Sequence, residues 1–218
     1  SSDVCSSDLT GAHEDVVIRR TDAIARMREQ LTHRDGTPKF NDPADTRVIY
    51  SSPLVDVAGN MQLVAETIEA CKTILELTHW QIRLLSKSNL LPKVADGIPP
   101  QHAQRMIYGV STGTLDDQLA RAFEAGTPLV SKRIASLHEL QDRGLRTYGM
   151  ICPSLPQRDY LGFAAATWDA IRAEKCEHVW TEVINVRGDS MIRTCAALRS
   201  AGYEWEAREL EHAAADKD

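Results

Sequence analysis

Short apolar runs recur along the chain and predict the strands of a sheet. There are five such runs with β-branched residues, and most of them are nearly continuous apolar stretches, which is typical of strands covered on both faces. The predicted strands are Arg47–Tyr50, Gln81–Leu85, Arg105–Val110, Arg146–Ile151 and Val179–Ile184.

Between these runs, apolar residues recur at every third or fourth position, a spacing that predicts helices. The predicted helices are Asp22–Leu31, Met61–Leu77, Ser131–Asp142, Asp159–Ala173 and Trp205–Ala213. Gly144 follows the third of them and is expected to end it. Cys71 lies on the apolar side of the second helix and Phe163 and Ile171 on that of the fourth, so we expect all three to face the core.

Strands that alternate with helices predict an α/β protein with a parallel sheet. The chain contains neither GxGxxG nor GxxxxGK[ST]. The pattern therefore favours a barrel or partial barrel over a dinucleotide-binding sheet.

The chain has 218 residues and no linker rich in Gly, Ser or Pro, which indicates a single domain. Residues 1–9 form the near-repeat SSDV-C-SSDL and resemble a sequencing adapter translated in frame. We therefore expect residues 1–9 to be an artefact and residues 10–218 to form one domain whose true amino terminus is missing.

Net charge and cysteine content narrow the class of protein further. The net charge of −6 gives no support to strong nucleic-acid binding, and no apolar run reaches the length of a membrane span. The cysteines form no CxxC-like pair, so we expect reduced thiols, a cytoplasmic location and no local zinc or iron–sulfur site. They are Cys5, Cys71, Cys152, Cys176 and Cys195.

In parallel barrels the active site forms at the carboxyl ends of the strands. The segments that follow the predicted strands are rich in small hydroxyl residues and contain one lysine, Lys87. Neutral donors around one cation would suit a zwitterionic or hydroxyl-rich ligand, with Lys87 on its carboxylate. The side chains expected at this edge are Ser51, Ser52, Asp56, Lys87, Ser88, Asn89, Ser111, Thr112, Thr114, Asp116, Asp117, Cys152, Ser154, Glu182 and Asn185.

Several of these residues also have an ordinary structural interpretation. Thr114 precedes two acidic residues and fits the cap of a helix. Lys87 fits a surface lysine and Cys152 a packed small residue. The tryptophans Trp80 and Trp180 fit packing beside strands, and the histidines show no metal-ligand spacing.

Four local patterns occur in order along residues 16–185. They are IYSSPLVD (Ile49 to Asp56), RLLSKS (Arg83 to Ser88), YGVSTGTLD (Tyr108 to Asp116) and GMICPSLP (Gly149 to Pro156). Together they resemble the radical S-adenosylmethionine superfamily, most closely its spore photoproduct lyase–like branch, often labelled DNA repair photolyase. In that branch, the first pattern is similar to the second barrel strand and its Ser-rich turn, the second to a "TKS" strand end, the third to "SITTLD" and the fourth to the fifth strand.

The resemblance implies a partial (β/α)6 TIM-like barrel with parallel strands, the first of which would be missing from this chain. It also implies a 4Fe-4S cluster held by a CxxxCxxC loop upstream, S-adenosylmethionine bound to the open iron, and an external electron donor. The chain lacks that loop, so we expect the fragment itself to bind no cluster and to be inactive.

The resemblance further implies roles for individual residues. Lys87 would bind the carboxylate of S-adenosylmethionine, and Ser111 with Thr112 its ribose or methionyl end. Cys152 would line the adenine, and Ser51 and Ser52 would lie beside cofactor and substrate. Spore photoproduct lyases have a hydrogen-donating cysteine near the position of Ser51 and Ser52, so this chain departs from the family there.

The expected activity is radical chemistry of a lyase, with a nucleic-acid substrate and no membrane partner. Two alternatives stay open on the sequence alone. One is a barrel lyase or aldolase that uses Lys87 as a Schiff-base nucleophile. The other is a cluster-free binding or scaffold protein that keeps the barrel.

Overall fold

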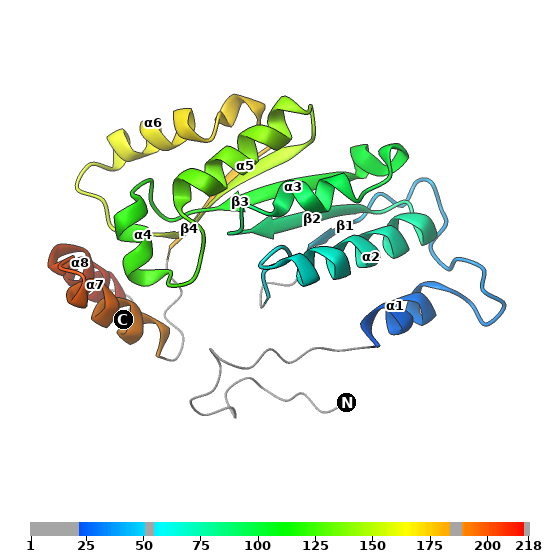
Figure 1. Ribbon diagram of the computed structural model, residues 1–218, viewed down its shortest axis with the longest axis horizontal. Coiled ribbons are helices and arrows are strands. Elements are labelled where there is room, and N and C mark those ends of the chain that lie inside the picture. Colours follow the sequence, from blue (N-terminus) through cyan, green and yellow to red (C-terminus); the bar gives the residue numbers. More distant parts are fainter. Residues whose placement is uncertain (1–21, 51–54, 184–188, 216–218) are drawn as a thin grey trace.

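The computed structural model describes residues 22–50, 55–183 and 189–215. Its centre is a sheet of five parallel strands that pair in the order of the sequence (Figure 1). The strands are β1 (Val48–Tyr50), β2 (Gln81–Ser86), β3 (Met106–Ser111), β4 (Thr147–Ser154) and β5 (Val179–Val183). Parallel neighbours in sequence order are the arrangement that repeated strand–helix units build.

Helices connect the strands, and two of them extend the chain after β5. They are α1 (Ala23–Leu31), α2 (Met61–Leu77), α3 (Leu91–Asp96), α4 (Asp117–Phe123), α5 (Val130–Asp142), α6 (Tyr160–Ala170), α7 (Ser190–Ser200) and α8 (Glu204–Ala215). Short 3-10 turns cover Pro100–Arg105 and Ala173–Lys175. Within the described ranges, no helix has both the length and the apolar character needed to cross a membrane.

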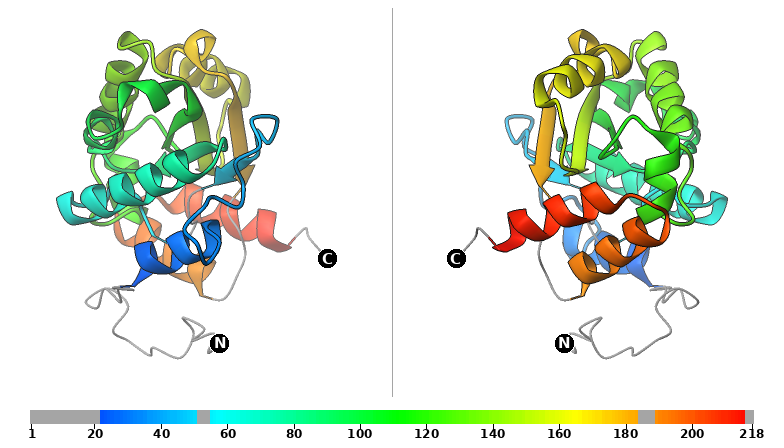
Figure 2. Two further views of the ribbon diagram at one scale, coloured as in Figure 1. Left: turned by 90° about the vertical axis from the view of Figure 1, so that its right-hand side faces the viewer. Right: turned by 90° about the vertical axis from the view of Figure 1, so that its left-hand side faces the viewer.

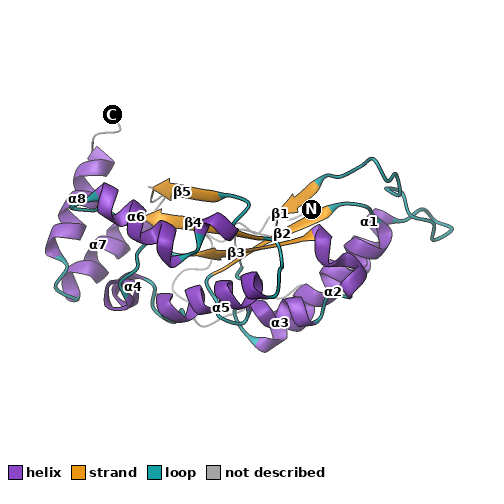
Figure 3. Cartoon of the chain, turned by 90° about the horizontal axis from the view of Figure 1, so that it is seen from above, coloured by secondary structure: helices purple, strands orange, loops and turns teal. Residues whose placement is uncertain are grey.

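The sheet is curved into a half-barrel with helices on its outer side. Figures 2 and 3 show α2, α3 and α5 along one face of the strands, while the other face is concave. Alternate residues of β2 and β3, such as Leu84 and Tyr108, join the helices in the main core, whereas Ile107 packs with Tyr148 and Met150 on the concave face. The curvature therefore directs one set of strand residues to a shared interior.

The α/β class, the parallel sheet and all five predicted strands are confirmed, with ends that shift by at most three residues within the described part of the chain. Cys71 is buried as expected, and Gly144 ends α5 in a left-handed conformation with φ of 68°. Trp80 packs in the core, also as expected, and its indole nitrogen donates to Asp45 over 2.7 Å.

Two predictions about these elements are wrong. The helix predicted over Asp159–Ala173 stops at Ala170, because Arg172 adopts a left-handed conformation with φ of 49° before the 3-10 turn begins. Ile171 is buried as predicted, but Phe163 is only half-buried.

The second wrong prediction concerns β5. Every residue of this strand is exposed, although its apolar sequence predicted cover on both faces. In the described chain, β5 pairs with β4 along one edge only, and no helix contacts it extensively. The burial of an edge strand depends on the elements that pack beside it and over it, and these cannot be predicted from the composition of the strand itself.

Helices α7 and α8 pack on each other and on α4, beside the carboxyl ends of the strands. Their shared core contains Leu119, Cys195, Leu198 and Leu210. Neither α4 nor α7 was among the helices predicted from the sequence, and together they support one side of the strand ends.

Candidate functional site

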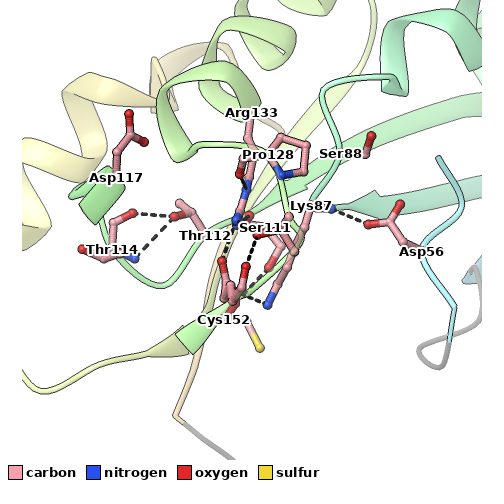
Figure 4. A network of polar contacts seen from close by, with 12 residues as sticks. Asp56, Lys87, Ser88, Ser111, Thr112, Thr114, Asp117, Pro128, Arg133 and Cys152 are labelled. Atoms are coloured by element: carbon pink, nitrogen blue, oxygen red, sulfur yellow. Dashed lines mark hydrogen bonds and ion pairs between the residues drawn. The ribbon is translucent and has the colours of Figure 1, made fainter. Parts of the chain in front are cut away.

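The carboxyl ends of β2, β3 and β4 bring the predicted site residues together. Lys87, Ser111 and Cys152 belong to one polar network, which continues into the interior through Glu124 and Arg133 (Figure 4). Ser51, Ser52 and Asn185 lie outside the described residues. The described part of the predicted edge is therefore a real spatial cluster.

At the centre of the network is the guanidinium of Arg133, whose side chain is completely buried. Its Nε donates to the carbonyl oxygen of Pro128 over 2.8 Å, and its Nη1 donates to that of Ser111 over 3.3 Å. Its Nη2 donates to the hydroxyl of Thr127 over 2.6 Å and lies 2.6 Å from Oε2 of Glu124. A planar guanidinium can satisfy several acceptors at once, so Arg133 ties the end of β3 to the turn before α5.

Glu124 is shared between two cations. Its Oε2 pairs with Arg133, and its Oε1 lies 2.5 Å from the Nζ of Lys87. The Glu124 side chain is 6 % exposed, but that of Lys87 is 31 % exposed. The buried carboxylate therefore holds Lys87 in place while part of the lysine still faces solvent.

Cys152 lies between charges of opposite sign. Its thiol is 3.8 Å from Oε2 of Glu182, a residue of the exposed strand β5. Burial raises the pKa of the Cys152 thiol, the negative charge of Glu182 raises it further, and Lys87 opposes this rise. The thiol is consequently protonated at neutral pH and is no ready nucleophile.

Ser111 and Thr112 are both nearly inaccessible, at 3 % and 2 % exposure. The hydroxyl of Ser111 donates to the carbonyl oxygen of Cys152 over 3.0 Å, which joins β3 to β4. The hydroxyl of Thr112 donates to the carbonyl oxygen of Thr114 over 2.5 Å. Both protons are thus used to shape the strand ends, and the free lone pairs of Ser111 are what this pair can offer a ligand.

The turn after β3 corrects the prediction that Thr114 caps the next helix. Asp116 is the cap of α4, and its Oδ1 accepts from the backbone nitrogens of Gln118 and Leu119 over 2.7 and 3.2 Å. Thr114 instead accepts from the backbone nitrogen of Asp116 over 3.0 Å. The observed cap lies two residues after the predicted one, because the turn itself occupies Thr112 to Leu115.

Glycine is required at position 113, because the backbone of this turn closely approaches the backbone of Pro153. A Cβ at this position would lie 1.9 Å from the carbonyl oxygen of Pro153, far inside contact distance. The peptide bond before Pro153 is cis. The end of β3 and the turn of β4 therefore touch through backbone atoms, which only glycine permits.

Asp56 organises the end of β2, a role that the sequence did not reveal. Its Oδ1 accepts from the hydroxyl of Ser86 over 2.6 Å, and its Oδ2 accepts from the backbone nitrogen of Lys87 over 2.8 Å. Ser86 and Ser88 then accept from backbone nitrogens two residues ahead of each, over 2.9 and 3.1 Å. The serines around Lys87 thus build the turn that presents the lysine. The only available signal was the position of Asp56 after a predicted strand.

A surface pocket of about 450 Å³ borders this network, because its lining includes Thr127 and Pro128, which both accept hydrogen bonds from Arg133. Arg121, Lys132 and Ser88 contribute to its lining, but Lys87, Ser111 and Cys152 do not. The pocket is therefore separate from the cluster at the strand ends.

The described residues do not fit a 4Fe-4S cluster. Three thiolates would have to converge on one place, but Cys71 lies in the main core and Cys195 between the last helices. Cys152 is at the strand ends, and Cys176 contacts Gln141 on α5. No group of three or more metal-binding side chains occurs in the part of the chain that the structure describes.

Comparison with known proteins identifies no relative of this chain. No family model, no curated protein and no solved structure matches this chain. The functional argument therefore depends on the geometry of the site and on the local motifs.

Proposed function

We propose that the strand ends around Lys87 bind the amino-acid moiety of S-adenosylmethionine, and that the chain is part of a radical S-adenosylmethionine enzyme with a six-unit partial barrel. The observation that supports this proposal most is the pair of opposite charges beside Cys152. Lys87 is a partly exposed cation, and Glu182 is an exposed carboxylate on the neighbouring side.

A zwitterion suits such a pair because each of its charges finds a partner of opposite sign. Lys87 would bind the ligand carboxylate through a charge-assisted hydrogen bond, and Glu182 would accept from the ammonium group. Ser111 could accept a hydrogen bond from a ligand hydroxyl through a free lone pair. These charges and acceptors support a zwitterionic ligand, although Cys152 by itself supplies too few thiolates for an iron–sulfur cluster.

In this superfamily, S-adenosylmethionine supplies radical chemistry that removes a hydrogen atom from a substrate. The chain's own contribution would be to hold the ligand and to limit side reactions. The protonated thiol of Cys152 is compatible with contact to an adenine ring, and Glu124 with Arg133 would keep Lys87 in position. The Schiff-base alternative gains no support, because the Lys87 ammonium group lies in an ion pair.

The test is calorimetric titration of the 218-residue chain with S-adenosylmethionine. Lys87→Ala should weaken binding roughly tenfold to hundredfold, the contribution of one charge-assisted hydrogen bond. Lys93→Ala is the matched control, because Lys93 is an exposed lysine on α3 that pairs with the exposed Asp96. Glu182→Gln should also weaken binding.

Two results would overturn the proposal. One is an absence of binding by the unsubstituted chain at millimolar S-adenosylmethionine. That result would favour the alternative of a cluster-free binding or scaffold protein that keeps the barrel fold. The other is equal binding by the Lys87→Ala variant and the unsubstituted chain. A simple loss of fold is excluded by recording thermal melts of the same samples.

A further inference from the structure

Arg83 carries a buried positive charge on the concave face of the half-barrel. The residue is 7 % exposed and lies on β2, where it pairs in register with Tyr50 of β1. Residues paired in register point to the same face of a sheet, so Arg83 and Tyr50 share the concave side. The Nη1 of Arg83 donates to the Tyr50 hydroxyl over 2.6 Å.

Three aromatic rings from three different strands surround this guanidinium. Its central carbon lies 5.3 Å from the ring centre of Tyr50 and 5.1 Å from those of Tyr148 and Trp180. Gly109, on the strand between β2 and β4, makes room for Tyr148, since a Cβ there would lie 2.2 Å from that ring. Cation–π contacts of this length are favourable but leave the charge itself uncompensated.

Curvature of the sheet brings two of these rings together. In a flat sheet, β1 and β5 would be about 19 Å apart, the sum of four strand spacings. The ring centres of Tyr50 and Trp180 are nevertheless only 6.0 Å apart, with planes inclined by 21°. Both side chains remain open to solvent, with exposures of 53 % and 40 %.

The guanidinium lacks the acceptors that a buried cation normally has. Within the described ranges, the Nε of Arg83 has no hydrogen-bond partner and no carboxylate forms an ion pair with this residue. The fully buried Arg133 has the partners that are usual for a buried arginine: it donates three hydrogen bonds and forms an ion pair with Glu124. Burial also raises the pKa of Tyr148, so this phenol is neutral and does not act as the counter-ion.

We propose that Arg83, Tyr50 and Trp180 form a binding site for a planar aromatic ligand that carries an oxyanion, either a carboxylate or a phosphate. The oxyanion would accept from the guanidinium of Arg83, including its unpaired Nε, and the planar ring would stack on the exposed aromatic side chains. This site explains both the unpaired buried donor and the two exposed rings that flank it.

The site is distinct from the strand ends around Lys87. Arg83 lies within β2, whereas Lys87 follows its last residue, Ser86, and four residues of extended chain correspond to about 13 Å. The inference therefore does not depend on the binding of S-adenosylmethionine. Binding at Arg83 should persist in the Lys87→Ala variant.

The test uses adenosine 5′-monophosphate as the probe, with adenosine and ribose 5-phosphate as the two half-ligands, in calorimetric titrations of the whole chain. The complete nucleotide should bind roughly tenfold or more tightly than either half, because only it engages both the cation and the rings. Higher salt should weaken the binding of the nucleotide and leave the binding of adenosine unchanged, because only the nucleotide carries a charge that salt can screen.

Two variants locate the site, and a third serves as control. Arg83→Met and Trp180→Leu should each weaken nucleotide binding roughly tenfold or more. Trp168→Leu should leave binding unchanged, because Trp168 is a comparably exposed tryptophan on α6. If Arg83→Met fails to fold, Trp180→Leu and the comparison of the three probes still decide.

Several outcomes would overturn the inference. Equal binding of adenosine and the nucleotide would show that the cation is not used. Equal binding of ribose 5-phosphate would show that the rings are not used. An equal loss of nucleotide affinity in the Trp180→Leu and Trp168→Leu variants would also contradict the proposed site. So would an absence of nucleotide binding by the unsubstituted chain at millimolar concentration.

Discussion

Glu124→Gln is the substitution that most directly tests how the strand ends are held. The change keeps the shape of the side chain but removes the charge that Arg133 and Lys87 share. Arg133 is completely buried and cannot turn toward water, whereas Lys87 is 31 % exposed and can. The loss of stability should therefore come almost entirely from the arginine.

Removing one partner of a buried ion pair costs about 3–5 kcal/mol, because the remaining charge is left without compensation. Arg133 keeps its hydrogen bonds to Pro128, Ser111 and Thr127, so we expect a value near the lower end, about 3 kcal/mol. For a chain of this length, that corresponds to a decrease in melting temperature of about 6–12 °C. Lys87→Gln removes the exposed partner and should cost about 1 kcal/mol or less.

The assay is urea unfolding at pH 7, followed by circular dichroism and by tryptophan fluorescence. Coincident curves from the two probes would support two-state analysis, and an unchanged m value would attribute the difference to stability. The double variant Glu124→Leu with Arg133→Met should recover part of the loss, since an apolar pair can replace a buried ion pair. Equal costs for Glu124→Gln and Lys87→Gln would refute the reasoning.

Two further predictions concern the turn after β3 and the start of α5. Gly113→Ala should destabilise the fold by about 1–3 kcal/mol, because its Cβ would meet the carbonyl oxygen of Pro153, whereas Gly59→Ala, which has ordinary contacts, should be nearly neutral in the same urea titrations. Hydrogen bonds from the side chain and backbone of Ser131 lower the pKa of Asp117, so its stabilising contribution is complete above its unfolded pKa near 4 and is lost as the pH falls through the lower folded value. Asp117→Asn should therefore destabilise the chain at pH 7 but much less at pH 3, and equal effects at both pH values would contradict this assignment.

Local sequence was sufficient to predict most of the elements. The five strands are recognisable because each is a short, mainly apolar run that includes β-branched residues. Helix α2 was predicted to the residue, since its apolar spacing continues without interruption until Leu77. Helices α3, α4 and α7 were missed. For α3 and α4 the reason is length, because six or seven residues are too few for a helical period to stand out.

The position of the candidate site was also predictable, but its internal contacts were not. Parallel strands place their carboxyl ends at one edge, so Lys87, Ser111 and Cys152 could be grouped from sequence alone. Asp56 and Glu124 act on Lys87 from 31 and 37 residues away in sequence, and no local pattern marks such pairs. A hydroxyl also looks the same in sequence whether it faces a ligand or donates to a carbonyl, as those of Ser111 and Thr112 do.

The sequence by itself determined the α/β class, the order of the strands and the edge at which polar residues gather, because these follow from local propensity and from the alternation of strands with helices. A curved sheet was expected from the predicted partial barrel, but only the tertiary structure decided that the curvature stacks Tyr50 on Trp180 across the concave face and surrounds Arg83 with rings. It also decided that β5 is exposed and that Arg133 is completely buried. The physical reason is that burial and charge compensation depend on neighbours far apart in the chain, which only the closed packing of the sheet and its helices brings together.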